Sequence, residues 1–147
     1  MTLPYLYREP GILPGFIKSY RNALTAAGHD SGKTDILGKF HIYVADSLEA
    51  AIREAEPYLI NYFDVHKAAD LERQEQGLLT QRDARTQLEH GFVLAGDPKR
   101  VADTIRKWRD ETGLTTISGT FHFGGMPQEL ALKNIRLFAE KVMPEFK

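Results

Sequence analysis

The 147-residue chain has the composition of a folded globular protein: 42% of its residues are hydrophobic, 27% are charged and none is cysteine. A net charge of −1 gives no electrostatic reason to expect nucleic acid, and the lack of cysteine excludes disulfides, thiolate nucleophiles and thiolate zinc sites. No run approaches the roughly 18 apolar residues that span a bilayer, and no signal-peptide pattern is present. We therefore expect a cytoplasmic protein with no membrane partner.

The first part of the chain predicts a strand end, a helix and a longer strand. Leu3 to Tyr7 is a short apolar and aromatic run that is typical of a strand end. Apolar residues at helical spacing predict a helix over about 12–27, with Gly28 as the left-handed residue that ends it. Ile36 to Val44 predicts a strand. Its alternation puts Phe40, Ile42 and Val44 on one face and His41 and Tyr43 on the other.

The middle of the chain predicts a long helical segment. Asp46-Ser47-Leu48-Glu49 has the form of a capping box, which predicts a helix that begins here with Asp46 as its N-cap. Pro57 is expected to kink this helix, or to start a new one that runs to about Phe63. Residues 64–90 are charged and weakly periodic, and we interpret them as a partly helical excursion over the surface. The alternative is a mobile lid that closes over a site.

The last part predicts two further strand and helix pairs. Gly91 to Ala95 is a brief apolar run, and Asp97-Pro98 then supplies a helix N-cap and a proline in the first turn. This helix should reach about Glu111 and end at Gly113. Thr115 to Phe123 predicts a strand, and Pro127 opens the last helix. The expected buried stripe of that helix is Ala131, Ile135, Phe138 and Val142, widened by Leu132 and Ala139.

Strands and helices alternate along the whole chain. This order builds a parallel sheet from right-handed βαβ units, so the sequence predicts an α/β fold. No linker divides the chain, and residues 1–147 are expected to form a single domain with 64–90 as its polar excursion or lid.

Three segments of the chain resemble the carboxyl-terminal part of the bacterial luciferase-like, flavin-dependent monooxygenases. The first two are Gly96-Asp97-Pro98-Lys99-Arg100-Val101-Ala102 and Phe121-His122-Phe123-Gly124-Gly125-Met126-Pro127. The third is the end of the last helix, Glu140-Lys141-Val142-Met143-Pro144-Glu145-Phe146. The opening Leu3-Pro4-Tyr5 is similar to the end of the fifth barrel strand of that family. The resemblance implies a partial (β/α)₈ barrel, from the end of strand five to helix eight.

The family's chemistry follows from the same resemblance. Reduced flavin, FMN as a rule and commonly supplied by a separate flavin reductase, reacts with oxygen and oxidises an aldehyde, an alkane or a sulfonate. Relatives use a deazaflavin for hydride transfer. A whole barrel needs roughly 250 residues, and the family's catalytic histidine and most of its flavin-phosphate ligands lie on the first four strands. No catalytic residue is therefore carried over to this chain.

The carboxyl ends of the strands are where a barrel enzyme places its site. His122 is the candidate acid or base there, and the candidates for cofactor binding are Gly124, Gly125, Arg8 and Tyr5. Each has a simpler interpretation, since a tight turn needs glycine, a lone histidine is commonly structural, and a surface arginine is commonly solvated. Tyr58, Tyr62 and Phe63 line a flavin or substrate pocket in one interpretation and form ordinary core in the other.

Several further residues are assigned to structure. Asp46 and Asp97 stand where helix N-caps are needed, and Trp108 falls on a buried helix stripe. The other histidines lack partners at metal-ligand spacing, so no metal site is expected; they are His29, His41, His66 and His90.

Three hypotheses of function remain open. In the first, two copies form a homodimer that rebuilds a barrel, by pairing Leu3–Tyr7 of one with Thr115–Phe123 of the other, and with it a flavin and substrate pocket. In the second, a non-catalytic truncated barrel serves as a partner subunit or is a remnant. In the third, the chain is one piece of a split or cloned protein whose complementing barrel half is encoded elsewhere.

Overall fold

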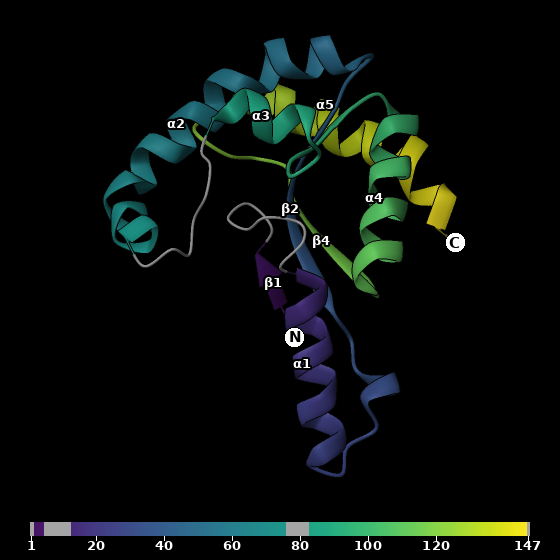
Figure 1. The fold of residues 1–147 in the computed structure, drawn as a ribbon. Coiled ribbons are helices and arrows are strands. Elements are labelled where there is room, and N and C mark those ends of the chain that lie inside the picture. The colour runs from purple at the N-terminus through teal and green to yellow at the C-terminus, as the bar shows by residue number, and fades with distance from the viewer. Residues whose placement is uncertain (1, 5–12, 76–82, 147) are drawn as a thin grey trace.

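The computed structural model describes residues 2–4, 13–75 and 83–146 (Figure 1). It is an α/β fold whose strands all pair in parallel. The strands are β1 (Thr2–Pro4), β2 (Leu37–Val44), β3 (Leu94–Gly96) and β4 (Thr116–Thr120). The α-helices are α1 (Leu13–Ala26), α2 (Leu48–Glu75), α3 (Ala84–Glu89), α4 (Pro98–Thr112) and α5 (Gln128–Leu137), with short turns of helix at η3 (Ser31–Lys33), η4 (Phe138–Val142) and η5 (Met143–Phe146).

Strand β2 is the centre of the sheet. It pairs with β1 along Leu37–Lys39, with β4 along Leu37–His41 and with β3 along Ile42–Val44. A barrel built in chain order would place β4 beside β3. In the part of the chain that the structure describes, β4 instead pairs with β2. The parallel α/β fold is confirmed, and the expected order of four consecutive barrel strands is not reproduced in the sheet.

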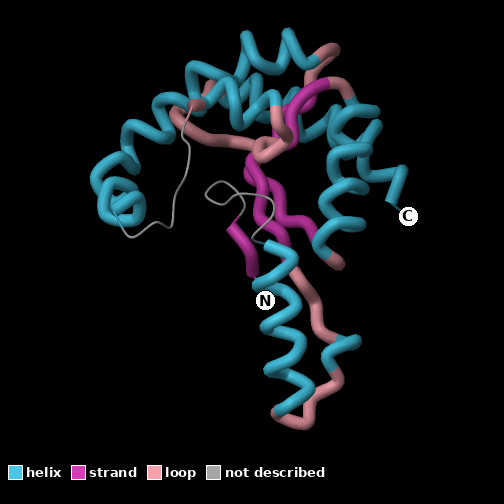
Figure 2. Tube along the Cα trace, viewed as in Figure 1, coloured by secondary structure: helices cyan, strands magenta, loops and turns pink. Residues whose placement is uncertain are grey.

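Side chains from both faces of β2 are buried, as the strand's alternation predicts. Figure 2 shows the strands in magenta with the helices in cyan around them. Phe40, Ile42 and Val44 pack against residues of α1, α4 and η4. Trp108 of α4 belongs to the same core. Tyr43 packs on the other side with residues of α2, α3 and α5. Helices on both faces explain why the strand reads as a nearly continuous apolar run.

Local signals fix the boundaries of α4. The Asp97 carboxylate accepts a hydrogen bond from the Arg100 N–H at 3.0 Å, and Pro98 occupies the first turn. Gly113 ends the helix in the left-handed conformation, at φ 71°. The predicted start and end of this helix are both confirmed.

The start of α2 differs from the expectation by one residue. The helix begins at Leu48, and the Ser47 hydroxyl accepts the hydrogen bond from the Ala50 N–H at 3.1 Å. The predicted N-cap at Asp46 is therefore wrong, and Asp46 is an exposed residue ahead of the cap. We expect Asp97→Ala to lower the free energy of unfolding by about 1 kcal/mol, and Asp46→Ala to change it by less than about 0.5 kcal/mol. Urea unfolding measures both, and equal losses would contradict this assignment of the caps.

Helix α2 also runs further than predicted. It continues through Pro57 to Glu75 and arcs over the sheet in Figure 1, so neither a new helix at Pro57 nor an end near Phe63 is found. Proline removes one backbone donor, and the buried side chains of Ala55 and Leu59 hold the helix on both sides of that gap. Residues 64–75 and α3 confirm that the charged excursion is helical in part.

The last strand and helix depart from their predicted patterns. Strand β4 ends at Thr120, three residues before the expected Phe123. On α5 the buried residues are Ala131 and Asn134, while Leu132 and Ile135 are each 41% exposed. The expected apolar stripe is therefore wrong at Leu132, Ile135 and Ala139, which are all exposed, because the helix turns a polar side chain toward the sheet.

That polar side chain, Asn134, completes the hydrogen bonding of β2. Its Nδ2 donates to the Ile42 carbonyl at 2.6 Å, and its Oδ1 accepts from the Val44 N–H at 2.8 Å. The amide thus takes the place of a neighbouring strand where β4 has ended.

We expect Asn134→Ala to lower the free energy of unfolding by about 2 kcal/mol, because it leaves two buried backbone groups of β2 without partners. The control is Arg136→Ala on the exposed side of the same helix, which should change it by less than about 0.5 kcal/mol. Chemical denaturation checks both variants. Equal stability of the two would mean that water or another group satisfies β2.

Candidate functional site

The loop between β4 and α5 contains three of the predicted site residues: His122, Gly124 and Gly125. His122 is exposed, and the two glycines have φ values of 58° and 76°. The other two candidates, Tyr5 and Arg8, lie outside the described residues.

Gly124 is in close contact with helix α2. A Cβ atom at this position would lie 1.7 Å from the Tyr58 carbonyl oxygen, and the Asn61 side chain donates to the Gly124 carbonyl at 2.8 Å. The backbone of the loop is therefore fastened to α2. Gly125 is more open, since its nearest neighbour would be the Asn61 amide nitrogen at 3.6 Å. Packing against the helix explains the glycine at 124, whereas Gly125 leaves backbone accessible to a ligand.

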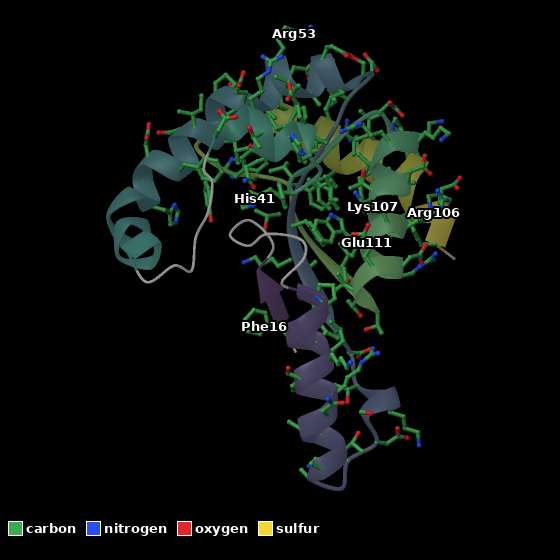
Figure 3. The ribbon with its side chains drawn as sticks, viewed as in Figure 1. Phe16, His41, Arg53, Arg106, Lys107 and Glu111 are labelled. Carbon is green, nitrogen blue, oxygen red and sulfur yellow. The ribbon has the colours of Figure 1, made fainter. Side chains whose placement is uncertain are left out.

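A column of aromatic rings lies where this loop, α2 and β2 meet. The ring of His41 lies 4.6 Å from that of Tyr62 and 4.9 Å from that of Phe123, with both pairs edge to face. His66 extends the column toward solvent, with its ring 4.4 Å from Tyr62 and its Nδ1–H donating to the Tyr62 carbonyl at 2.7 Å. Figure 3 shows His41 beside β2 and below α2. We call His41, Tyr62, His66 and Phe123 the ring column.

His41 is a buried imidazole with an unsatisfied nitrogen. The residue is 4% exposed, and its Nε2 atom has no hydrogen-bond partner among the described residues. Burial, together with the charges of Lys39 and His66, lowers the pKa of His41 from 6.5 to about 4. The ring is therefore neutral at pH 7, with one donor and one acceptor nitrogen.

The ring column is near the carboxyl end of β4. His41 is in register with Thr120, the last residue of that strand, and Phe123 follows in the loop. Tyr62 is half-buried and packs against the core of α2 and α3, which agrees with the core interpretation, and its role in lining a pocket stays a prediction. Phe63 is core, and Tyr58 contributes its backbone to the glycine loop.

Beyond the ring column, β2 leads into a polar cluster. The Tyr43 hydroxyl donates to Glu54 at 3.0 Å, and Lys133 lies 3.5 Å from the same carboxylate. Burial and the Glu54 carboxylate raise the pKa of Tyr43, so this phenol is protonated in the physiological range. The cluster ties β2 to α2 and α5.

Sequence reasoning missed the role of His41. Alternation placed it opposite Phe40 and Ile42, and a histidine in an apolar strand is commonly a satisfied core residue. Its distinguishing feature is the absence of a partner at Nε2, which depends on Tyr62 and Phe123 from distant segments. A single sequence carries no signal for that arrangement.

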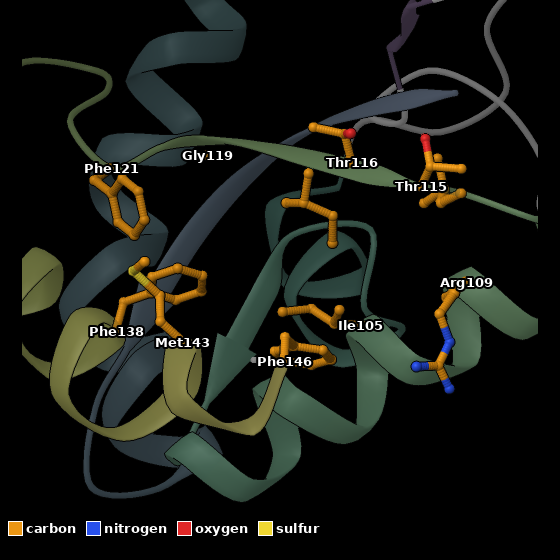
Figure 4. Close-up of a pocket in the computed structure, with 11 residues that line it drawn as sticks. Ile105, Arg109, Thr115, Thr116, Gly119, Phe121, Phe138, Met143 and Phe146 are labelled. Carbon is orange, nitrogen blue, oxygen red and sulfur yellow. The ribbon is translucent and has the colours of Figure 1, made fainter. Parts of the chain in front are cut away.

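Hollows are also found elsewhere among the described residues. An apolar groove of about 470 Å³ between β4, α4 and the end of the chain has Arg109 at one end and Phe121 and Phe138 at the other (Figure 4). A second, open and charged hollow of about 630 Å³ lies at the starts of α2 and α4. Its helix starts are capped by the chain's own Ser47 and Asp97. Among the described residues, no three potential metal ligands cluster.

Comparison with known proteins identifies related chains. The sequence model of a family described as luciferase-like monooxygenase matches residues 2–116. A search of curated proteins gave no match. The monooxygenase RslO1 from Streptomyces bottropensis is 22% identical, with a TM-score of 0.73 over 99% of this chain and 41% of its own.

Two further solved structures contain FMN or a modified FMN. The oxygenating constituent of 3,6-diketocamphane monooxygenase from Pseudomonas putida, in complex with FMN, is 18% identical, with a TM-score of 0.68 over 99% of this chain and 42% of its own. A riboflavin lyase with modified FMN and riboflavin is 16% identical, with a TM-score of 0.60 over 97% of this chain and 37% of its own. The chain thus spans about two fifths of the length of these structures, and the likeness is one of fold. Of the helices described, none is both long and apolar enough to cross a membrane.

Proposed function

Because the chain belongs to the luciferase-like monooxygenase family, we propose that it forms part of a flavin-dependent oxidoreductase that uses reduced FMN. The match over residues 2–116 is the observation that carries this proposal. Two structural neighbours that contain FMN or a modified FMN support the choice of cofactor over a deazaflavin. A flavin reductase partner would supply the reduced form.

We place the flavin at the loop between β4 and α5. Gly125 presents open backbone in a left-handed conformation, His122 is exposed beside it, and the unsatisfied Nε2 of His41 lies below. Bound reduced FMN would supply the electrons for oxidation of a substrate by oxygen. The chain's own residues would orient the ring against Tyr62 and exclude water from His41.

The proposal includes assembly into a larger barrel. We assign β1, β2, β3 and β4 to barrel strands five to eight, so the remaining strands come from a second copy of the chain or from a complementing half. The short overlap with the solved structures supports this, since the chain spans 41% of RslO1. The edge of β4 that faces away from β2 is where a further strand would pair. Residues 64–90 would then act as a lid over the completed site.

The test is size-exclusion chromatography with light scattering in the presence of FMN. The proposal expects a dimer of about twice 16.6 kDa that carries flavin absorbance. A monomer would contradict rebuilding by two copies. A flavin-free peak at any mass would contradict the cofactor assignment and would favour the alternative of a non-catalytic partner subunit.

A further inference from the structure

We propose that the apolar groove between β4, α4 and the end of the chain binds an aliphatic carboxylate, with the carboxylate on Arg109 and the alkyl chain running toward Phe121 and Phe138. This site is separate from the proposed flavin site and does not depend on it. The charged end of the groove lies beside the start of β4, whereas the glycine loop follows the carboxyl end of that strand. The ligand is held there, and no reaction is assigned to it.

The chain's own elements form the walls of the groove. Ile117 and Phe121 line it from β4 and the residue that follows this strand, and they share a face because they are four positions apart. Ile105 lines it from α4, and Met143 and Phe146 line it from η5. The groove is therefore an apolar space between one face of the sheet and two helical segments.

The wall that η5 forms is fastened to α4. Arg106 Nη2 donates to the Glu145 carboxylate at 2.6 Å, and the guanidinium carbon of Arg106 lies 5.4 Å from the centre of the Phe146 ring. The groove between this wall and β4 keeps a volume of about 470 Å³, which is in the range that small ligands occupy. Met143 is 50% exposed and Phe146 is 40% exposed, so an alkyl chain in the groove would remove apolar surface from water.

The two ends of the groove differ in polarity (Figure 4). At one end the rings of Phe121 and Phe138 pack edge to face, with their centres 5.1 Å apart. At the other end lies Arg109, near the end of α4, together with Thr115 and Thr116 at the start of β4. This polarity matches a molecule with an apolar tail and a polar head.

Charge selects the head group. Among the described residues that line the groove, Arg109 is the one that carries a charge. Its Nε donates to the exposed Asp110 carboxylate at 2.9 Å, and the guanidinium has two terminal nitrogens besides, which can both donate to a second carboxylate. An anionic head is therefore favoured over a neutral or cationic one.

The apolar middle of the groove selects an alkyl chain as the tail. A polypeptide would bring backbone N–H and C=O groups between Ile105, Ile117 and Met143, whose side chains offer no hydrogen-bond partner. An alkyl chain carries no such groups and can follow an irregular apolar surface. The occupant that fits both ends and the middle is an aliphatic carboxylate.

The experiment is an NMR titration of the full chain with decanoate. We expect decanoate to shift the amide signals of Arg109 and Met143 and to leave that of Gly125 unchanged. Octanoate, which is two methylene groups shorter, should bind about tenfold more weakly. Decyltrimethylammonium has an alkyl chain of the same length with the opposite charge, and it should bind at least tenfold more weakly than decanoate.

Two variants with matched controls test the two ends of the site. Arg109→Gln should weaken decanoate binding about tenfold, whereas Arg136→Gln on the exposed side of α5 should leave it unchanged. Met143→Asp places a carboxylate in the groove and should weaken binding at least tenfold. Leu132→Asp is its control, because Leu132 is 41% exposed and does not line the groove.

Three outcomes would overturn the proposal. The first is an absence of shifts at millimolar decanoate, or an affinity that neither Arg109→Gln nor Met143→Asp changes. The second is a lower mass of Met143→Asp in light scattering, which would show that a second copy of the chain covers the groove. The third is displacement of decanoate by FMN, because the two ligands are expected to bind at separate places.

Discussion

Gly124→Ala is expected to lower the free energy of unfolding by at least about 4 kcal/mol, so that little of the chain remains folded. The added Cβ would lie 1.7 Å from the Tyr58 carbonyl oxygen, and the residue has a φ of 58°, which a side chain tolerates poorly. The carbonyl cannot retreat, because Ala55 and Leu59 fix this part of α2 in the core. Relief of the clash requires the loop and the helix to separate.

Gly125→Ala is the matched control. Its φ is 76°, so it carries the same left-handed cost of about 1–2 kcal/mol, but its Cβ would meet only the Asn61 amide nitrogen at 3.6 Å. Urea unfolding followed by circular dichroism measures both variants. If the two substitutions cost the same, the close contact between Gly124 and α2 is not formed in solution.

The difference between these glycines illustrates what the sequence could and could not predict. Both were recognised as turn residues, because Gly-Gly before Pro127 is a local pattern. The boundaries of α4 were predicted for the same reason, since Asp97 and Gly113 act within a few residues of their own position. The contact between Gly124 and Tyr58 joins segments that are 66 positions apart, and no local rule contains it.

The same limit explains the errors. Helix α2 crosses Pro57 because tertiary packing outweighs one lost hydrogen bond. Asn134 is buried on α5 because β4 stops short and leaves the backbone of β2 exposed to it. In each case a neighbour distant in sequence determines the result. The candidate site follows the same rule, because α2 and the β4–α5 loop both contribute to the surroundings of His41.

His41 predicts a loss of stability in mild acid. In the folded chain its pKa is about 4, against 6.5 in the unfolded chain. Below pH 6.5 the His41 imidazole therefore binds a proton in the unfolded chain but not in the folded chain. The free energy of unfolding then falls as the pH falls. The stability is fully present above pH 6.5, and the loss is complete near pH 4. A shift of this size corresponds to about 3 kcal/mol.

The His41→Phe variant isolates this effect. Phenylalanine keeps the edge-to-face packing with Tyr62 and Phe123 but cannot titrate, so the stability of the variant should fall less between about pH 7 and pH 5, by about 2 kcal/mol. The pKa values of Asp83 and Asp103 are lowered by hydrogen bonds, so their contribution is lost at still lower pH and is shared by both chains. Urea unfolding at both pH values gives the difference. Parallel losses in the two chains would show that His41 is hydrated or already protonated in the fold.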